Sequence, residues 1–372
     1  MKLKIRKDLL NEKLNIVSKA LSLKNIIPVL SGIKFELDES NLKLTSSNDD
    51  VTIETSINSK DILEIKETGS IVIPGKYLLE IVRKIEDEFI NVETDGLKIV
   101  LSTKTGEYTL NGMDSKEFPN IKFDLVEDPI TINQNIIKNI INQTGFAVST
   151  QESRPILTGV NFKIENDVLE CTSTDSYRLA KKIIKISKNQ KEKLNIVIPG
   201  RNLVELMKLL TEEEKNIDMH IFSNNILFKT DDMLFQSRLL NGTYPDTSKL
   251  IPDNFELTIE LNMEEFYNAI DRVSLLTSEK DKNLIKMEII NNELILSSNS
   301  QEIGKIEEKI SIKKNKDTNI KIAYSSKYMM DAIRSLRCEE LELKLNGEIK
   351  PIILKNKCDD NLIQLILPIK TF

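Results

Sequence analysis

IVIPGKYLLEIVRKI, residues 71–85, decides the fold because the chain repeats this stretch twice. IVIPGRNLVELMKLL follows at residues 196–210, and IKIAYSSKYMMDAIRSL follows at residues 320–336. With Lys76, Arg201 and Lys327 in register, the copies lie 125 and 126 residues apart. The third copy is longer before its helix and lacks the Pro-Gly turn. This spacing exceeds the roughly 20–50 residues of solenoid repeats, so each copy predicts a domain.

Other segments return at nearly the same spacing. PVLSGIKFEL begins at Pro28 and PILTGVNFKI at Pro155, while LKLTSSND at Leu42 matches LECTSTDS at Leu169 and LILSSNS at Leu294. Several independent segments that keep one period indicate three structural repeats. We therefore predict three domains, residues 1–128, 129–253 and 254–372, with joints near Asp128 and Asn254.

Each repeat mixes two periodicities. Residues 8–23 carry Leu10, Leu14, Val17 and Leu21 at helical spacing, with Asp8 as a candidate cap, and residues 76–85 form a second amphipathic helix. Alternating runs predict strands at residues 32–39, 41–45, 51–57, 70–73, 89–92, 97–102 and 107–111. This pattern predicts an α+β fold of three similar domains, each with two helices packed on antiparallel sheets.

Composition excludes several classes of protein. The net charge is −6, so bulk charge does not favour binding to nucleic acid. No run of 18 apolar residues predicts a membrane helix, and the charged N-terminus does not resemble a signal peptide. Three separated cysteines fit a reducing, cytoplasmic environment, and we expect each to be a small buried residue.

No motif for catalysis or for a metal is present. GxGxxG, Walker A, HExxH and GxSxG patterns are absent, and paired Cys/His zinc spacing is absent too. His220 is the one histidine, and it lies on a probable strand as a core or surface residue. We expect no catalytic residue, no metal site and no cofactor.

The second helix of each repeat presents a basic pair opposite its apolar face. On a wheel of 100° per residue the pairs are Lys76 with Arg83, Arg201 with Lys208, and Lys327 with Arg334. One such helix is readily explained as a solvated surface. For three registered copies in an acidic chain, a solvated surface and a concentrated positive surface are equally good interpretations. A positive surface of this kind would contact phosphates without reading bases.

The chain ends in LIQLILPIKTF, an apolar strand interrupted by Pro368. Such a strand is usually part of a core. Pro368 suggests that the tail leaves the sheet, where Leu367, Pro368 and Ile369 could form part of an apolar groove for a peptide.

The repeats, VIPG before a basic helix residue, STDSYRLA at Ser173, NGTYPD at Asn241 and LILPIKTF at Leu365 together resemble the bacterial β sliding clamp, the processivity subunit of DNA polymerase III. The resemblance covers the whole chain. It implies a non-catalytic, head-to-tail homodimer whose six domains close a ring around duplex DNA. It also implies partners: the polymerase III alpha subunit, the clamp loader, and other polymerases and repair proteins with clamp-binding motifs.

The resemblance assigns residues to three surfaces. It implies that a peptide-binding pocket uses Leu157, Thr174, Ser176, Arg178, Leu179, Pro245, Lys249, Leu250, Leu365, Leu367, Pro368 and Ile369. Lys24, from the loop after the first helix, joins the three basic pairs as a DNA-facing residue. The dimer joint is implied to pair Ile81, Ile85 and Tyr108 with Leu275 and Leu276, although Ile81 and Ile85 also fit an intradomain core.

Departures and alternatives stay open at this point. Lys249 and Lys370 stand where arginine is common, and Thr371-Phe372 extend the tail. A lysine lacks the planar fork of arginine, so polar contacts at the pocket rim would differ. The rival functions are an α+β enzyme with an unrecognised small-molecule site and a monomeric scaffold.

Overall fold

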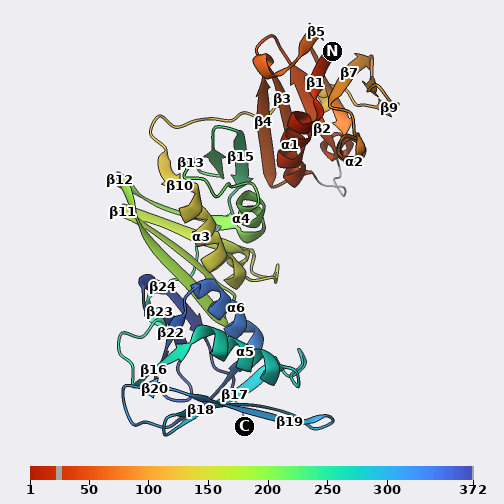
Figure 1. The fold of residues 1–372 in the computed structure, drawn as a ribbon. Coiled ribbons are helices and arrows are strands. Elements are labelled where there is room, and N and C mark those ends of the chain that lie inside the picture. The colour runs from red at the N-terminus through yellow and green to blue at the C-terminus, as the bar shows by residue number, and fades with distance from the viewer. Residues whose placement is uncertain (22–26, 371–372) are drawn as a thin grey trace. The chain divides into compact units, whose positions relative to one another are not determined.

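The computed structural model describes residues 1–21 and 27–370, and for residues 187–192 it describes the backbone alone. Contacts group the chain into two compact units, residues 1–135 with 205–239 and residues 136–204 with 240–372 (Figure 1). The three points at which the chain passes from one unit to the other, after Asn135, Val204 and Leu239, all fall inside the central repeat. The boundaries at Asp128 and Asn254 therefore stay a prediction.

The first unit is built on two antiparallel sheets. A five-stranded sheet has the order β5 (Glu64–Glu67), β1 (Lys2–Arg6), β7 (Phe89–Asp95), β8 (Lys98–Ser102), β9 (Glu107–Asn111). An eight-stranded sheet has the order β10 (Ile130–Asn133), β13 (Asn216–Ile221), β14 (Asn225–Lys229), β15 (Met233–Arg238), β4 (Val51–Asn58), β3 (Asn41–Ser47), β2 (Gly32–Leu37), β6 (Gly69–Pro74). Helix α1 (Lys7–Val17) packs on β3, β4 and helix α2 (Gly75–Lys84).

The second unit repeats this plan. A seven-stranded sheet has the order β11 (Gly159–Thr174), β12 (Arg178–Pro199), β24 (Asp359–Ile366), β23 (Ile352–Asn356), β22 (Glu340–Leu345), β16 (Leu257–Asn262), β20 (Lys313–Lys314). A four-stranded sheet has the order β19 (Gly304–Ser311), β18 (Glu293–Ser300), β17 (Leu284–Ile290), β21 (Ile320–Ser325). Helices α5 (Met263–Ser274) and α6 (Ser326–Leu336) pack together. The helices of the central repeat, α3 (Gln134–Thr144) and α4 (Gly200–Met207), each span a boundary between the two units.

A buried serine in each repeat explains why the segments LKLTSSND, LECTSTDS and LILSSNS resemble one another. The Ser46 hydroxyl donates to the Val17 carbonyl at the end of α1. Ser173 donates to Thr144 O at the end of α3 over 2.5 Å, and Ser298 donates to Val273 O at the end of α5 over 2.6 Å. The last carbonyls of a helix lack partners within it, so each serine satisfies one and fastens the helix to its strand.

The glycine of the VIPG stretch has a steric cause. A Cβ atom on Gly75 would lie 2.5 Å from Leu21 Cδ1 and 3.2 Å from Ser31 O. A Cβ atom on Gly200 would lie 3.0 Å from Val148 Cγ2 and 3.2 Å from Thr158 O. Both helices thus begin where neighbouring side chains and one carbonyl oxygen lie close to the glycine, so a larger residue at either position would push Leu21 or Val148 aside.

The apolar faces predicted for the second helices are confirmed in the core. Leu78 and Val82 of α2 are fully buried, as are Met329 and Ile333 of α6. The α6 face joins a core cluster with Phe266, Ile270 and Val273 of α5 and with both sheets of the second unit. Burying a side chain of this size contributes about 1.5–3 kcal/mol.

Several details of the sequence prediction are wrong. The first α-helix ends at Val17, and residues 18–20 form a 3₁₀ turn, because Ser46 ties down the terminal carbonyl. Asp8 lies in the first turn rather than at the cap, where its charge favours the positive end of the helix dipole. Strands β1 and β5 were not predicted, although the alternation of Lys2, Leu3, Lys4 and Ile5 in β1 is typical of a strand. Among the described residues, no helix is long and apolar enough to span a membrane.

Candidate functional sites

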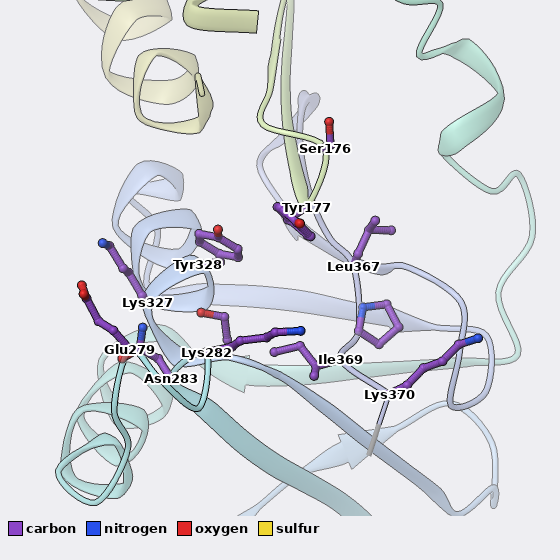
Figure 2. Close-up of a pocket in the computed structure, with 12 residues that line it drawn as sticks. Ser176, Tyr177, Glu279, Lys282, Asn283, Lys327, Tyr328, Leu367, Ile369 and Lys370 are labelled. Carbon is purple, nitrogen blue, oxygen red and sulfur yellow. The ribbon is translucent and has the colours of Figure 1, made fainter. Parts of the chain in front are cut away.

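A pocket of about 670 Å³ lies in the second unit, between the β11–β12 turn, the loop after α5, the start of α6 and the C-terminal tail. Figure 2 shows Tyr177 and Tyr328 on one side of this pocket and Leu367 and Ile369 of the tail on the other, with Lys370 directed away from the tyrosines. The lining residues are Ser176, Tyr177, Glu279, Lys282, Asn283, Ser325, Lys327, Tyr328, Leu367, Pro368, Ile369 and Lys370. Apolar and aromatic walls with three lysines and one glutamate suit a short apolar peptide that carries negative charge.

Two backbone hydrogen bonds fix the tail beside the pocket. The N–H of Leu367 donates to Tyr177 O over 2.8 Å, and the N–H of Ile369 donates to Ala323 O over 2.7 Å. Pro368 lies between them and has no N–H to donate. The tail therefore does leave the β24 ladder, as predicted, but it is held on the β11–β12 turn and on the edge strand β21.

The β11–β12 turn presents Tyr177 to solvent. Asp175 Oδ1 accepts from the N–H of Tyr177 over 2.9 Å and from the N–H of Arg178 over 3.0 Å. The Thr174 hydroxyl donates to Arg178 O over 2.6 Å, and Ser176 has a φ of 77°. A side-chain oxygen that satisfies successive amides is an Asx turn, which stabilises this tight reversal. Tyr177 stands 60% exposed at its tip.

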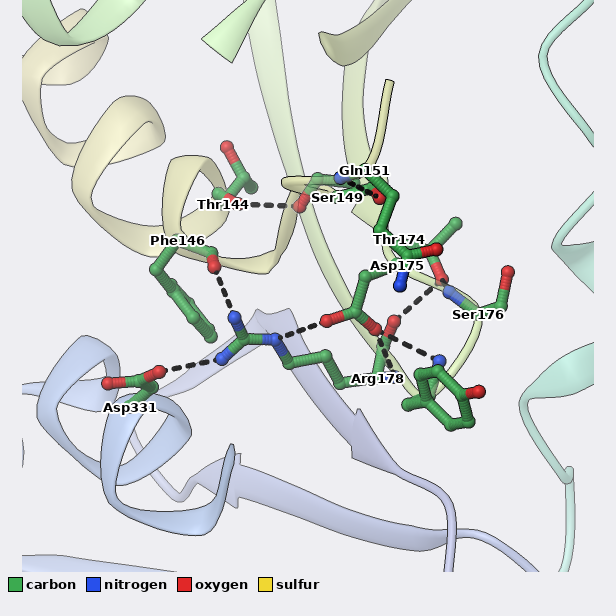
Figure 3. Close-up of polar contacts among 11 residues, drawn as sticks. Thr144, Phe146, Ser149, Gln151, Thr174, Asp175, Ser176, Arg178 and Asp331 are labelled. Carbon is green, nitrogen blue, oxygen red and sulfur yellow. Dashed lines mark hydrogen bonds and ion pairs between the residues drawn. The ribbon is translucent and has the colours of Figure 1, made fainter. Parts of the chain in front are cut away.

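Arg178 holds this turn against two other elements (Figure 3). Its Nε donates to Asp175 over 3.0 Å, one terminal nitrogen donates to Asp331 of α6 over 2.7 Å, and the other donates to Phe146 O over 2.7 Å. The guanidinium also stacks on the Tyr328 ring, 4.5 Å from its centroid. With all three nitrogens bonded and only 10% of its side chain exposed, Arg178 positions the turn and Tyr328.

Burial raises the pKa of the Tyr328 phenol, and the negative charge of Asp175 adds to that shift. Tyr328 therefore stays neutral at physiological pH and presents a ring with a polar tip to the pocket.

The residues predicted for the peptide pocket fall into three groups. Ser176, Leu367, Pro368 and Ile369 line the pocket described above. Leu179 and Leu365 are buried in a cluster with Ile353, against which Ile251 packs. The remaining predicted residues do not line the 670 Å³ pocket: Leu157 packs with Val197 and Tyr244, Thr174 and Arg178 brace the turn, and Pro245, Lys249 and Leu250 are exposed.

The predicted peptide pocket contains four of the twelve residues that line this pocket. Tyr177 lies inside the quoted STDSYRLA motif, and an exposed aromatic residue at a turn could have singled it out. Ser325 and Tyr328 lie in the third copy of the opening stretch, and Glu279, Lys282 and Asn283 lie in a loop without any repeat signal.

Family models match almost the whole chain. The models described as DNA polymerase III beta subunit match residues 1–122 with the N-terminal domain, 131–246 with the central domain and 248–370 with the C-terminal domain. The chain belongs to the DNA polymerase III beta subunit family. The resemblance drawn from the repeats and the predicted α+β fold are both confirmed.

Relatives match at full length. The chain is 40% identical over 377 residues to the beta sliding clamp of Staphylococcus epidermidis and 39% identical to that of Staphylococcus aureus, with 100% of each chain covered. The crystal structure of the DNA polymerase sliding clamp from Bacillus subtilis matches with a TM-score of 0.96 at 38% identity, again over 100% of both chains. Sliding clamps are scaffolds rather than enzymes, which confirms the expectation of a non-enzymatic chain.

The basic pairs predicted to face DNA are all exposed, and they differ in their contacts. Five of the six residues lie on α2, α4 or α6, and Lys208 lies in the turn directly after α4. Lys208 pairs with Glu205 over 2.6 Å, and Arg334 donates to the Tyr267 hydroxyl. Lys327, at the start of α6, also lines the pocket described above. Lys24 lies outside the described residues.

The residues predicted for the dimer joint differ in exposure within one chain. Leu275 is 74% exposed and Tyr108 is 37% exposed, whereas Ile81 and Leu276 are half-buried. Ile85 is 4% exposed, which favours the alternative that it belongs to the domain core. Tyr108 lies on β9, the edge strand of the five-stranded sheet.

His220 is held in the interior of the first unit. His220 is buried, and its Nδ1 accepts from the N–H of Val126 over 3.0 Å; burial lowers its pKa. No group of three or more His, Cys, Asp or Glu side chains that could hold a metal occurs among the residues described.

Proposed function

We propose that this chain acts as a DNA sliding clamp, in which two copies close head to tail around duplex DNA and tether the replicative polymerase. The observation that carries the proposal is the full-length match to beta sliding clamps at 40% identity. Three domains, residues 1–128, 129–253 and 254–372, would give six in the closed ring. Family models that match residues 1–122, 131–246 and 248–370 support this division.

The DNA-facing surface in this proposal is formed by Lys24, Lys76, Arg83, Arg201, Lys208, Lys327 and Arg334. Cations on one face of three equivalent helices would attract phosphates without reading bases, which a ring that moves along DNA requires. Glu205, Asp331 and the net charge of −6 moderate the attraction. A topological link needs no tight grip.

The dimer joint in this proposal brings Ile81 and Tyr108 of one copy against Leu275 and Leu276 of the other. The exposure of Leu275, at 74%, supports it, because a leucine this exposed is favoured at an interface. Edge strands β9 and β19 offer unpaired backbone groups that a second copy could satisfy. A heterologous contact of this kind closes a ring only if its rotation fits.

The partner site in this proposal is the pocket of Figure 2 extended by the Leu179–Leu365 cluster. Its occupants would be short apolar motifs of the polymerase III alpha subunit, the clamp loader, and other polymerases and repair proteins. A few buried apolar anchors dominate such recognition. The work of a replication clamp would take place in the cytoplasm, as the cysteine usage also suggests.

Two measurements test the proposal. Gel filtration with light scattering gives twice the mass of one chain if the copies pair, and the mass of one chain if the protein is a monomeric scaffold. Retention on nicked circular DNA then tests whether the dimer is closed, because linearising the circle releases a ring but not a protein that grips the phosphates.

A further inference from the structure

Cys338 and Cys358 lie on segments that contact one another, 20 residues apart in sequence. Cys338 follows the C-terminal end of α6, and Cys358 lies in the two-residue turn between β23 and β24. Cys338 is half-buried and packs against the core of the third repeat, whereas Cys358 is exposed. The expectation that all three cysteines are buried is therefore wrong for Cys358, because the turn leaves its side chain in solvent.

Both flanks of Cys338 are tied to the turn that carries Cys358. On one side, Asn356 Nδ2 donates to Leu336 O over 3.2 Å. On the other side, Lys357 pairs with Glu340 over 3.1 Å. The N–H of Cys358 donates to Asn356 Oδ1 over 2.8 Å, which closes the turn over this contact. The two cysteines are thus held in one neighbourhood by contacts on both sides of Cys338 to the two residues that precede Cys358.

Electrostatics agrees with this placement. Burial raises the pKa of the Cys338 thiol, and a negative charge on Cys358 raises that pKa further. Both amine contacts of Lys357 go to carboxylates, Glu260 over 2.7 Å and Glu340 over 3.1 Å.

We propose that Cys338 and Cys358 form a reversible intrachain disulfide when the protein meets a peroxide. The exposed Cys358 thiolate attacks one oxygen of the peroxide, so that the S–O bond of a sulfenic acid forms and the O–O bond breaks. The hydroxide or alkoxide that leaves takes a proton from solvent and becomes water or an alcohol. The sulfur of Cys338 then attacks Cys358, so that the S–S bond forms, the S–O bond breaks and a second water leaves. A dithiol reductant returns both thiols.

The disulfide would join two elements whose other ends line the pocket. Helix α6 begins with Lys327 and Tyr328 at the pocket and ends next to Cys338. Strand β24 begins after Cys358 and continues into Leu367 and Ile369 at the pocket. Figure 1 shows α6 beside β23 and β24, and these elements are in contact. The crosslink would pin the far ends of both pocket walls.

The test is peptide mapping of the full-length protein after treatment with hydrogen peroxide and without reductant. Trypsin releases residues 338–344 and 358–370, because Arg337 and Lys357 precede the two cysteines. We expect these peptides to be joined, about 2 Da lighter than their sum, and separated by dithiothreitol. Cys171→Ser serves as the matched control, because Cys171 is buried and should not change the result.

Two further readouts keep the proposal open to refutation. The midpoint of thermal unfolding should rise on oxidation of the wild type but not of Cys338→Ser or Cys358→Ser, because a crosslink restricts the unfolded chain. The wild-type protein is also alkylated after peroxide treatment. The proposal is overturned if Cys338 still reacts completely with the alkylating reagent while Cys358 is found as a sulfenic acid or linked to a second chain.

Discussion

Replacing Arg178 with alanine removes three hydrogen bonds at once and leaves two carboxylates without their partner. Asp175 has 12% of its side chain exposed and Asp331 has 28%, so water compensates for the loss only in part. Breaking a buried ion pair by removing one partner costs about 3–5 kcal/mol. The partial exposure of Asp331 places the expected cost near the lower end, about 3 kcal/mol.

Hydrogen exchange measures this cost locally and does not require two-state unfolding of a chain with several domains. A loss of about 3 kcal/mol speeds the exchange of amides in the β11–β12 turn and in α6 by roughly 100-fold. Arg178→Lys keeps the charge but cannot make the fork, so it should fall between wild type and alanine, near tenfold.

Arg154 provides the matched control for this prediction. It is exposed, and its contact to Ser176 of the same turn is long, at 3.5 Å. Arg154→Ala should change exchange by no more than about twofold, as surface substitutions do. If Arg178→Ala changes exchange as little as Arg154→Ala does, the positioning role assigned to Arg178 is wrong.

Three more variants probe the proposed surfaces. Leu276→Asp would place a charge in the dimer joint and should give monomers at low micromolar concentration in light scattering. The control is Ile349→Asp, because Ile349 is exposed. A stable Leu276→Asp dimer would refute the assigned joint. Lys76→Ala with Arg83→Ala should weaken binding to linear DNA of any sequence and reduce the salt slope by about one unit per lost phosphate contact. The control is Lys98→Ala with Lys116→Ala, which removes two exposed lysines that are not predicted to face DNA. If both double variants give the same salt slope, Lys76 and Arg83 are not DNA-facing residues. Ending the chain at Ile366 removes Leu367, Pro368 and Ile369 but keeps the buried Leu365, so we expect a folded dimer that binds a clamp-motif peptide weaker by at least about 2 kcal/mol, measured by fluorescence titration. Unchanged peptide affinity would remove the tail from the site.

The three repeats could be predicted from the sequence because local physics forces the same residues to return. Gly75 and Gly200 begin helices where a Cβ would crowd Leu21 or Val148, and Ser46, Ser173 and Ser298 each fasten a helix end. Requirements of this kind act within one repeat and leave a period in the chain. The apolar and basic faces of the second helices follow in the same way.

The pocket could be predicted only in part because its walls come from distant segments. The motif at Ser173 and the tail at Leu365 drew attention as sequence, and both contribute to it. Tyr328 lies at the pocket because Arg178 of the β11–β12 turn bonds Asp331 of α6, 153 residues later in the chain. No periodicity marks a contact of that range. The proximity of Cys338 to Cys358 was missed for a related reason, since it depends on the β22–β23 pairing and the turn that follows.

Retention on DNA after cleavage tests the central claim most directly. The protein is loaded onto nicked circular DNA, freed of unbound protein by gel filtration in moderate salt, and divided into one portion left circular and one portion linearised. A closed clamp stays with the circle and leaves the linear DNA through its ends, because it holds DNA by topology rather than by phosphate contacts. Equal retention on both, lost equally as salt rises, would show a protein that binds the DNA surface and would contradict the account.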